Sequence, residues 1–414
     1  MILRFIQSIL AFHARRVIAA YKPEIVGITG SVGKTSAKEA IARVLGGHFK
    51  LRETYKNYNN ELGLTLTILG QVSAGRSISG WLSIFKEASK LALGKIPDYP
   101  ECLVLEMGID HPGDMDYLVS IARPSRAVIT KLGTAHLQFF KSLDELYAEK
   151  FKLAEAINDE GWIIYNADDD KLSSLVEKST KRSIGFGFSD TAEIRAEQAS
   201  LVIDSAGIVG QGFKLIYRGS TIPVILPNAL GRPAIYAALA AAATAASYDI
   251  NGLEVAQTLR EVKQPAGRMQ LISGKNNSLI VDDTYNASPD SVFEGLKALQ
   301  EVPAEKKKRV WVVLGSMKEL GELSKQSHQE VAKAATEIAD IVVAVGEEAK
   351  DVSKLWFPDS EQAADYLIDK VEAGDLLYIK GSQAARMEKI VKILMTEPEK
   401  ADTLLVRQGK EWNC

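Results

Sequence analysis

The chain has 414 residues, of which 46% are hydrophobic and 25% are charged, and its formal net charge is −3. This length accommodates two or three domains with complete cores, and the composition is typical of a soluble globular protein. The negative net charge argues against a nucleic-acid partner, because phosphate backbones favour a basic surface. The two cysteines, Cys102 and Cys414, are too few for a disulfide framework or a cysteine metal site and suit a reducing cytoplasm.

Residues 1–22 predict an amphipathic helix. One face collects apolar residues at helical spacing, namely Ile2, Phe5, Ile6, Ile9 and Phe12. The opposite face collects Arg4, Gln7, Ser8 and Arg15. The segment is too short and too charged to span a bilayer, and no signal-peptide cleavage pattern follows it. Two interpretations stay open: the helix packs on its own domain or a second subunit, or it lies on an anionic membrane surface.

From Glu24 onward, short β-branched runs alternate with helical patterns. The runs suit parallel strands buried on both faces, and they cover 24–29, 102–107, 126–130, 162–166, 309–315, 340–346 and 376–381. Between 192 and 227, shorter strand-like pieces separated by glycine turns predict an antiparallel β insertion, and an alanine-rich helix follows. The alternation predicts an α/β fold. Proline and glycine near 263–268 mark a boundary, so we predict a central domain over 23–264 and a C-terminal α/β domain over 265–414.

The stretch "GITGSVGKTS", Gly27–Ser36, lies between a predicted strand and a predicted helix. Such a junction presents backbone N–H groups to an anion, a lysine can reach the outer phosphates, and a hydroxyl can bind Mg²⁺. The strict phosphate-loop pattern has a glycine where Ile28 stands, but the context still predicts a phosphate-binding loop. Its predicted members are Gly30, Ser31, Gly33, Lys34, Thr35 and Ser36.

The same stretch resembles the ATP-binding loop of the Mur ligases, a family that adds amino acids or peptides to cell-wall precursors. Eight further stretches resemble that family in order along the chain: 57–69, 104–115, 134–142, 166–170, 265–269, 282–291, 315–321 and 380–382. The resemblance implies a phosphate-loop ATPase domain followed by a Rossmann-like domain. It also implies an ADP-forming ligase that uses ATP to convert a carboxylate into an acyl phosphate, which an amine then attacks.

The resemblance implies two sets of Mg²⁺ ligands. Thr35 and Glu106, which ends a buried strand, would hold a first ion, and His136 and Lys150 would hold a second. In several family members the lysine at the matching place is carbamylated, which turns an ammonium into a carboxylate-like ligand. Lys152 competes for this role, but the spacing from His136 favours Lys150. A plain surface lysine is the simpler alternative.

Contacts to the nucleotide are implied in the same way. Arg268 corresponds to the arginine that reaches the γ-phosphate once the two domains close, and Asp283 corresponds to the acid that holds the ribose. The family's helix after the β insertion carries polar residues near the adenine, but Pro233 and Ala234 stand in their place. Base recognition would then depend on backbone groups or on Asn166.

Substrate contacts are implied on both sides of the cleft. Asn59, Asn60 and His111 match substrate-side motifs, and Asn286 and Lys380 match positions near the incoming amine. The simpler alternatives are that the first three cap loops and that Asn286 makes a turn. The family's arginine is also missing beyond Lys380, where position 383 is a glutamine.

Three functions are compatible with these motifs. The resemblance favours a ligase that adds D-alanyl-D-alanine to a muramyl-peptide precursor, and a poly-γ-glutamate or folylpolyglutamate-type ligase and a non-catalytic nucleotide-binding scaffold are the alternatives. Only about two dozen residues precede the loop strand, so we expect the family's N-terminal UDP-binding domain to be missing. We expect a cytoplasmic protein, with the N-terminal helix as a contact to a partner or to the inner face of the membrane.

Overall fold

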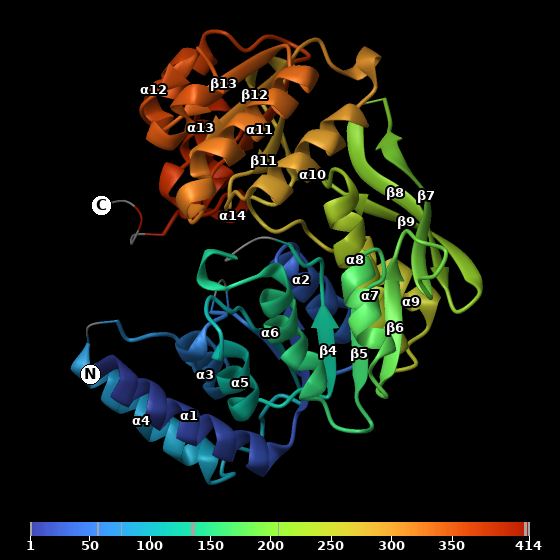
Figure 1. Cartoon of the computed structure of the whole chain (residues 1–414), viewed down its shortest axis with the longest axis vertical. Helices are drawn as coiled ribbons and strands as arrows, with labels where there is room; N and C mark the ends of the chain where they lie inside the picture. The colour runs from blue at the N-terminus through green and yellow to red at the C-terminus, as the bar shows by residue number, and fades with distance from the viewer. Residues whose placement is uncertain are drawn as a thin grey trace. The chain divides into compact units, whose positions relative to one another are not determined.

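The computed structural model describes residues 2–55, 58–75, 77–133, 137–205, 207–409 and 412 (Figure 1). The chain divides into two compact units. The first unit contains residues 1–197, 214–223 and 236–259, and the second contains residues 198–213, 224–235 and 260–414. The chain therefore passes between the units within the segment that was predicted as a β insertion.

The first sheet, within the described ranges, has nine strands in the order β2-β3-β1-β4-β5-β6-β7-β8-β9. The pairs from β2 to β7 are parallel, which the predicted crossover pattern requires. The strands are β1 (Glu24–Thr29), β2 (Leu51–Glu53), β3 (Cys102–Glu106), β4 (Arg126–Ile129), β5 (Trp162–Asn166), β6 (Arg182–Gly187), β7 (Ile194–Ile203), β8 (Ile208–Tyr217) and β9 (Ser220–Pro227).

The predicted β insertion corresponds to β7, β8 and β9. These strands do not form a sheet of their own, because β7 continues the first sheet in parallel with β6. The links from β7 to β8 and from β8 to β9 are only a few residues long, and neighbouring strands joined so closely must run antiparallel. The α/β fold and the antiparallel insertion are therefore as predicted.

Helices surround the first sheet on both sides of its central strands. They are α1 (Ile2–Tyr21), α2 (Lys34–Leu45), α3 (Glu61–Leu69), α4 (Ile78–Ala92), α5 (Asp114–Ile121), α6 (Leu143–Glu155), α7 (Asp170–Glu177), α8 (Arg232–Ala246) and α9 (Gly252–Leu259). One core cluster joins α1, α3, α5 and α6 to strand residues such as Leu103 and Leu105. These two leucines are two positions apart and so point to the same face of β3.

Helix α1 is present as predicted, and of its apolar face Ile6 packs against the core whereas Phe5 and Phe12 stay exposed. It packs against α3 and α4 through Leu10, Ala14 and Val17, which are fully buried. Phe5 is 67% exposed and Phe12 is 53% exposed. The helix has a second apolar stripe of smaller residues, and these allow close approach to the neighbouring helices. No helix in the described part of the chain has the length and hydropathy that a bilayer crossing requires.

The second sheet, in the same described ranges, has six strands in the order β10-β11-β15-β12-β13-β14. β10 is antiparallel to β11, and the other pairs are parallel. The strands are β10 (Gln270–Ser273), β11 (Leu279–Asp283), β12 (Val310–Gly315), β13 (Ile341–Val345), β14 (Trp356–Phe357) and β15 (Leu376–Lys380).

Two layers of helices enclose this second sheet. α10 (Pro289–Gln300) and α11 (Ser324–Ile338) share one core cluster with the sheet, and α12 (Ser360–Ile368) and α13 (Glu388–Leu394) share the other. A short helix, α14 (Ala401–Leu404), follows. This three-layer arrangement is the Rossmann-like α/β fold that was predicted for the C-terminal part.

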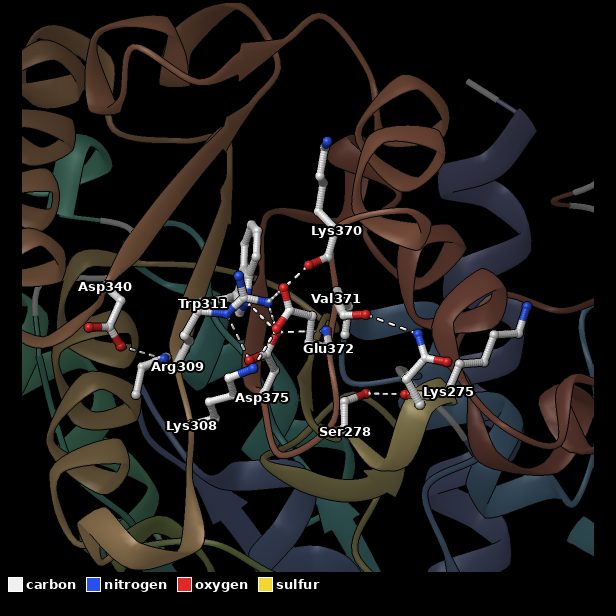
Figure 2. Close-up of polar contacts among 12 residues, drawn as sticks. Lys275, Ser278, Lys308, Arg309, Trp311, Asp340, Lys370, Val371, Glu372 and Asp375 are labelled. Carbon is white, nitrogen blue, oxygen red and sulfur yellow. Dashed lines mark hydrogen bonds and ion pairs between the residues drawn. The ribbon is translucent and has the colours of Figure 1, made fainter.

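An ion-pair network closes the amino-terminal ends of the second sheet's strands (Figure 2). Asp375 is 1% exposed and accepts hydrogen bonds from Arg309 Nη2 (2.6 Å), Trp311 Nε1 (2.9 Å) and the Glu372 amide (2.8 Å). Burial would raise the pKa of Asp375, but these bonds lower it overall. This end of the sheet is therefore structural, and the loops at the opposite, carboxyl-terminal end are the ones free to bind ligands.

Candidate functional site

The predicted phosphate loop runs from the end of β1 into the first turn of α2. Gly33 caps α2 with φ +85°, a left-handed conformation that favours glycine. At Gly30, a Cβ atom would lie 1.9 Å from Thr130 Oγ1, so a side chain there would have to displace that threonine. Both glycines are therefore required by the local backbone. The loop presents the N-terminal end of a 12-residue helix, which attracts anions.

The segment after β4 holds this loop in place. The amides of Ser31 and Val32 donate to Lys131 O at 2.9 and 3.3 Å, and Thr130 Oγ1 donates to Val32 O at 2.8 Å. Ser31 Oγ also exchanges hydrogen bonds with the backbone of Gly133. The predicted metal ligand at position 136 follows this segment directly, but it lies outside the described residues, so its role stays a prediction.

Two lysines reach the loop from different elements. Lys34 Nζ donates to Gly30 O at 2.7 Å, and Lys150 Nζ, on α6, donates to Ser31 Oγ at 2.8 Å. Lys150 is 1% exposed. Its pKa lies well below the ordinary lysine value because burial disfavours the ammonium form, and the positive charge of Lys34 lowers it further against the opposing effect of Asp110. The structure thus brings two predicted catalytic lysines to the same short loop.

The alternative lysine, Lys152, points elsewhere. Its ammonium pairs with Asp116 at 2.6 Å and with Glu149 at 2.7 Å. Glu149 is 4% exposed and also accepts the amides of Gly113 and Met115 at the start of α5. The Glu149 carboxylate links α6 to the start of α5, and Lys152 forms an ion pair with this carboxylate. Lys152 therefore has a structural role in this geometry, whereas Lys150 contacts the phosphate loop.

The predicted first metal site is built around the carboxylate of Glu106 at the end of β3. Thr35 Oγ1 donates to its Oε2 at 3.1 Å, and Asn59 Nδ2 donates to its Oε1 at 3.2 Å. Glu106 is 2% exposed. A hydroxyl and a carboxylate are hard oxygen ligands, and adjacent ligands on Mg²⁺ lie about 3 Å apart, so the pair fits this ion. Among the residues placed by the structure, no group of three or more His, Cys, Asp or Glu forms a metal cluster.

The other predicted residues of this region take different places. Asn60 caps α3, because its Oδ1 accepts the amide of Gly63 at 3.0 Å, which matches the simpler alternative for this residue. The ring of His111 is exposed and lies 4.6 Å from the ring of Phe139. Asn59 alone of these three contacts the Glu106 carboxylate. The substrate roles of all three stay predictions.

An aromatic pair near the end of β5 was not predicted. Asn166 is buried, and its Oδ1 accepts the amide of Asp168 at 3.0 Å. Asp168 Oδ2 in turn accepts the hydroxyl of Tyr236 at 2.7 Å, and the ring of Tyr236 lies 5.1 Å from that of Phe188. Sequence reasoning considered only the missing polar residues near Pro233 and overlooked Tyr236 in the same helix. A half-buried pair of rings offers a π surface beside the predicted base contact.

In the second unit, Lys380 and Asp283 form a buried ion pair. Lys380 Nζ lies 2.6 Å from Asp283 Oδ2 and donates to Asn286 O at 3.0 Å, and the hydroxyl of Tyr378 donates to the same carboxylate oxygen at 3.1 Å. Lys380 is 1% exposed, and burial lowers its pKa although Asp283 opposes this effect. Three predicted residues therefore meet at the carboxyl ends of β11 and β15.

Arg268 and the neighbouring turn are also organised by buried groups. The guanidinium of Arg268 lies 4.0 Å from the ring centre of Tyr285, and its buried Nε has no hydrogen-bond partner among the described residues. Asp282 accepts the amide of Gly267 at 3.1 Å and the hydroxyl of Thr284 at 2.6 Å. Burial raises the pKa of Asp282 to about 6. Asp282 is thus a support for the turn before Arg268. The predicted γ-phosphate contact of Arg268 stays a prediction.

A pocket of about 490 Å³ opens among the loops that follow β12, β13, β14 and β15. Its charged lining contains both signs, namely the cations Lys318, Arg386 and Lys389 and the acids Glu347, Glu348, Asp359 and Glu361. Lys318 pairs with Glu348 and Lys389 pairs with Glu361, and the bond from Lys318 lowers the pKa of Glu348 to about 2. Sequence reasoning did not find this pocket, because its residues come from four separate loops.

A buried histidine supports the first of these loops. His328, on α11, is 3% exposed; its Nε2 accepts the amide of Met317 at 3.0 Å, and its Nδ1 donates to Ser324 O at 2.7 Å. Both bonds together require a proton on Nδ1 and a lone pair on Nε2, as in a neutral ring. The histidine therefore fixes the backbone between two residues that line the pocket, Ser316 and Lys318.

The fold and these contacts define a class: an α/β protein with a glycine loop between a strand and a helix, a buried lysine beside that loop, and a charged pocket on a Rossmann-like unit. Two family models match in the corresponding order. The Mur ligase middle domain matches residues 88–245, and the Mur ligase glutamate ligase domain matches residues 267–383.

Similar proteins agree with this match. A UDP-N-acetylmuramoyl-tripeptide–D-alanyl-D-alanine ligase of Bacillus subtilis is 28% identical over 386 residues, covering 90% of this chain and 76% of the relative. A MurF ligase of Thermotoga maritima, solved with ADP, superposes with a TM-score of 0.79 at 27% identity, covering 95% of this chain and 84% of that one. MurF of Acinetobacter baumannii superposes with a TM-score of 0.75 at 26% identity, covering 92% and 79%. The chain belongs to the Mur ligase family, as its motifs predicted.

Proposed function

We propose that this protein is an ATP-dependent peptide ligase that adds D-alanyl-D-alanine to a muramyl-peptide precursor. The observation that carries the proposal is the joint placement of Lys34, Lys150 and the Thr35–Glu106 pair around one phosphate loop. A relative named for this reaction aligns with 90% of this chain, and a solved MurF ligase superposes on 95% of it. A nucleotide-binding scaffold without catalysis would have no need for the buried, low-pKa Lys150 beside the loop.

The phosphate loop would bind the triphosphate of ATP through its backbone amides and Lys34. The N-terminal end of α2 and the lysine both favour negative charge, and this charge increases on the transferred phosphoryl group during the reaction. In this structure Lys34 Nζ donates a hydrogen bond to Gly30 O. We propose that its ammonium exchanges this neutral acceptor for phosphate oxygens when the nucleotide binds, because a charged acceptor gives the stronger bond.

Thr35 and Glu106 would hold a Mg²⁺ ion, and Lys150 would contribute to a second metal position after carbamylation. The ion would supply charge neutralisation at the phosphates. Carbamylation joins the neutral amine of a lysine to CO₂ and releases one proton. The lowered pKa of Lys150 supports this proposal, because it increases the fraction of neutral amine at a given pH. Ser31 Oγ already orients the nitrogen at 2.8 Å.

The charged pocket of the second unit is the proposed site of the incoming dipeptide. A free dipeptide is a zwitterion, and the pocket supplies cations for its carboxylate and acids for its ammonium group. The position also fits, because ligands of open α/β sheets bind outside the carboxyl ends of the strands. Lys380 and Asn286 were predicted for this role, but Lys380 is engaged by Asp283, and neither residue lines the pocket. We therefore assign the dipeptide contacts first to Lys318, Glu348 and Lys389.

The test is product formation with three mixtures of substrates. Purified protein receives ATP and Mg²⁺ with UDP-muramyl tripeptide plus D-alanyl-D-alanine, with a γ-glutamyl acceptor plus glutamate, or with neither, and both ADP release and the mass of the product are measured. Product in the first mixture alone is expected. Product in the second mixture alone would assign the chain to the glutamate-adding class. ATP binding without product in any mixture would overturn the proposal.

A further inference from the structure

Helices α1 and α4 expose large apolar side chains to solvent. Phe5 (67% exposed) and Phe12 (53%) lie on α1, and Ile78 (79%) and Leu82 (64%) lie on α4, with Leu93 (59%) just beyond its end. Few large apolar residues elsewhere in the described ranges are as exposed as these. Five such residues on two helices and their edge are more than the scattered surface hydrophobics of an ordinary globular protein.

The two helices lie side by side at the edge of the first unit (Figure 1, dark and light blue). Their C-terminal ends meet, because the amide of Ile96 donates to the hydroxyl of Tyr21 at 3.1 Å. Each helix already has a packed face: Leu10, Ala14 and Val17 are buried on α1, and α4 has a buried face of its own. The exposed residues are therefore a second apolar stripe on each helix, additional to the one that stabilises the fold.

Each exposed stripe follows the helical repeat. Phe5 and Phe12 are seven residues apart, and Ile78 and Leu82 are four residues apart, so each pair lies on one side of its helix. Arg16 lies one turn beyond Phe12, with its guanidinium carbon 5.6 Å from the phenylalanine ring centre. The apolar stripe of α1 thus ends in a cation that remains close to it.

The charge of this helix pair differs from that of the whole protein. The sequences of α1 and α4 contain five arginines and lysines, three in α1 and two in α4, and a single acid, Glu87. The chain as a whole carries a formal net charge of −3. Exposed apolar side chains combined with a local excess of positive charge are the properties of helices that lie in the surface of an anionic bilayer.

We propose that α1 and α4 together form a docking surface for an anionic lipid bilayer. Phe5, Phe12, Ile78 and Leu82 would enter the boundary between headgroups and acyl chains, and Arg16, Lys86 and Lys90 would contact lipid phosphates. A second copy of this chain fits the surface less well, because it would bring two positively charged helix pairs together. The proposal concerns where the protein acts and does not depend on which ligase reaction it catalyses.

The test is sedimentation of the full chain with vesicles of phosphatidylcholine alone or with 30% phosphatidylglycerol. Binding to the anionic vesicles is expected, with weak binding to the neutral ones and a decrease as salt is added. The paired substitutions F5S/F12S and I78S/L82S should each lower the partition coefficient at least about tenfold, since each removes two apolar side chains that the bilayer would bury. K86S/K90S should reduce the preference for anionic lipid while leaving the residual binding to neutral vesicles.

The matched control is L253S, which removes a leucine that is 62% exposed on α9 and should leave binding unchanged. Thermal unfolding of each variant separates lost binding from lost folding, because these exposed positions should tolerate serine. The proposal is overturned if the folded protein stays out of both vesicle pellets. It is also overturned if light scattering shows a dimer that F5S/F12S dissociates, because the apolar surface would then be an interface between copies.

Discussion

Two buried lysines, one in each unit, have opposite electrostatic surroundings. Lys150, on α6, and Lys380, the last residue of β15, are each 1% exposed. Lys150 donates a hydrogen bond to the Ser31 hydroxyl, and the positive charge of Lys34 disfavours the ammonium form of Lys150. Lys380 lies 2.6 Å from the carboxylate of Asp283, which favours the ammonium form. Burial lowers both pKa values; Asp110 opposes this effect at Lys150, but among the described residues only Lys380 of these two forms a direct ion pair.

The contrast distinguishes the proposed reactive lysine, Lys150, from a lysine that supports the fold, Lys380. A buried lysine with no ion pair among the described residues, such as Lys150, is costly for folding and is a candidate for chemistry. A buried lysine paired with a carboxylate instead fixes its surroundings, here the loop that carries Asn286. The two positions cannot be distinguished by burial alone, and the identity of the nearest polar group decides between them.

Replacing Lys34 with methionine should give the largest effect. The change keeps the length of the side chain but removes the charge that we propose to face the phosphates, so kcat should fall by about a thousandfold, or about 4 kcal/mol. Steady-state ADP release measures the loss. Lys150 should also become easier to protonate, because a neighbouring positive charge is gone. A variant with normal kcat would contradict the role of the loop in catalysis.

Replacing Lys380 with methionine should destabilise the protein by about 3–5 kcal/mol, because Asp283 would remain buried with the Tyr378 hydroxyl as its one side-chain partner among the described residues. Chemical denaturation measures the free energy of unfolding. The double variant K380M/D283N removes both charges and should recover much of this loss. If K380M were as stable as the unmodified protein, the pair would not be a support.

Replacing Lys150 with methionine should stabilise the protein, in contrast to K380M. We expect a gain of about 1 kcal/mol in the free energy of unfolding near pH 7 in CO₂-depleted buffer. Burial lowers the pKa of Lys150 in the folded protein from 10.5. At a pH between the folded-state pKa and 10.5, the unfolded chain therefore binds more protons than the folded chain. The unmodified protein therefore gains stability as pH rises through this window, and the advantage of K150M should disappear near pH 10.5. An advantage that persists above pH 10.5 would come from packing instead of charge.

Ligase activity of K150M should nevertheless be lost, and this separates function from stability. With ¹³C-labelled bicarbonate, the unmodified protein should show a carbamate signal in the NMR spectrum that K150M lacks. A signal in both proteins would place the modification elsewhere. Activity that does not depend on bicarbonate would argue for an unmodified Lys150.

Replacing Lys318 with methionine should have the smallest effect, a roughly tenfold rise in KM for the dipeptide with KM for ATP unchanged. The lysine is half-exposed and already paired with Glu348, so its net contribution is modest. The matched control is K297M, which changes an exposed lysine on α10 outside the pocket. An equal rise in KM for ATP would place the pocket in nucleotide binding.

Much of the fold could be predicted from the sequence because its signals are local. Each of the seven predicted parallel strands is present within a residue or two, since a buried strand needs a continuous apolar run and leaves that run visible. The phosphate loop was predicted for a similar reason, because its glycines, lysine and threonine are adjacent along the chain. The role of the apolar face of α1 was left open by the sequence, since the helix carries two apolar stripes and only the neighbouring helices decide which one is buried.

The sequence by itself determined the α/β class, the phosphate loop and the family, because these depend on residue types at short, fixed spacing. Only the tertiary structure decided that Lys150 and not Lys152 reaches Ser31, that Asp283 engages Lys380, and that four loops enclose a pocket of mixed charge. These contacts join residues up to 119 positions apart, and electrostatic surroundings exist only where such distant side chains meet. Chain order contains no record of that proximity, and the pKa of a buried lysine depends on it.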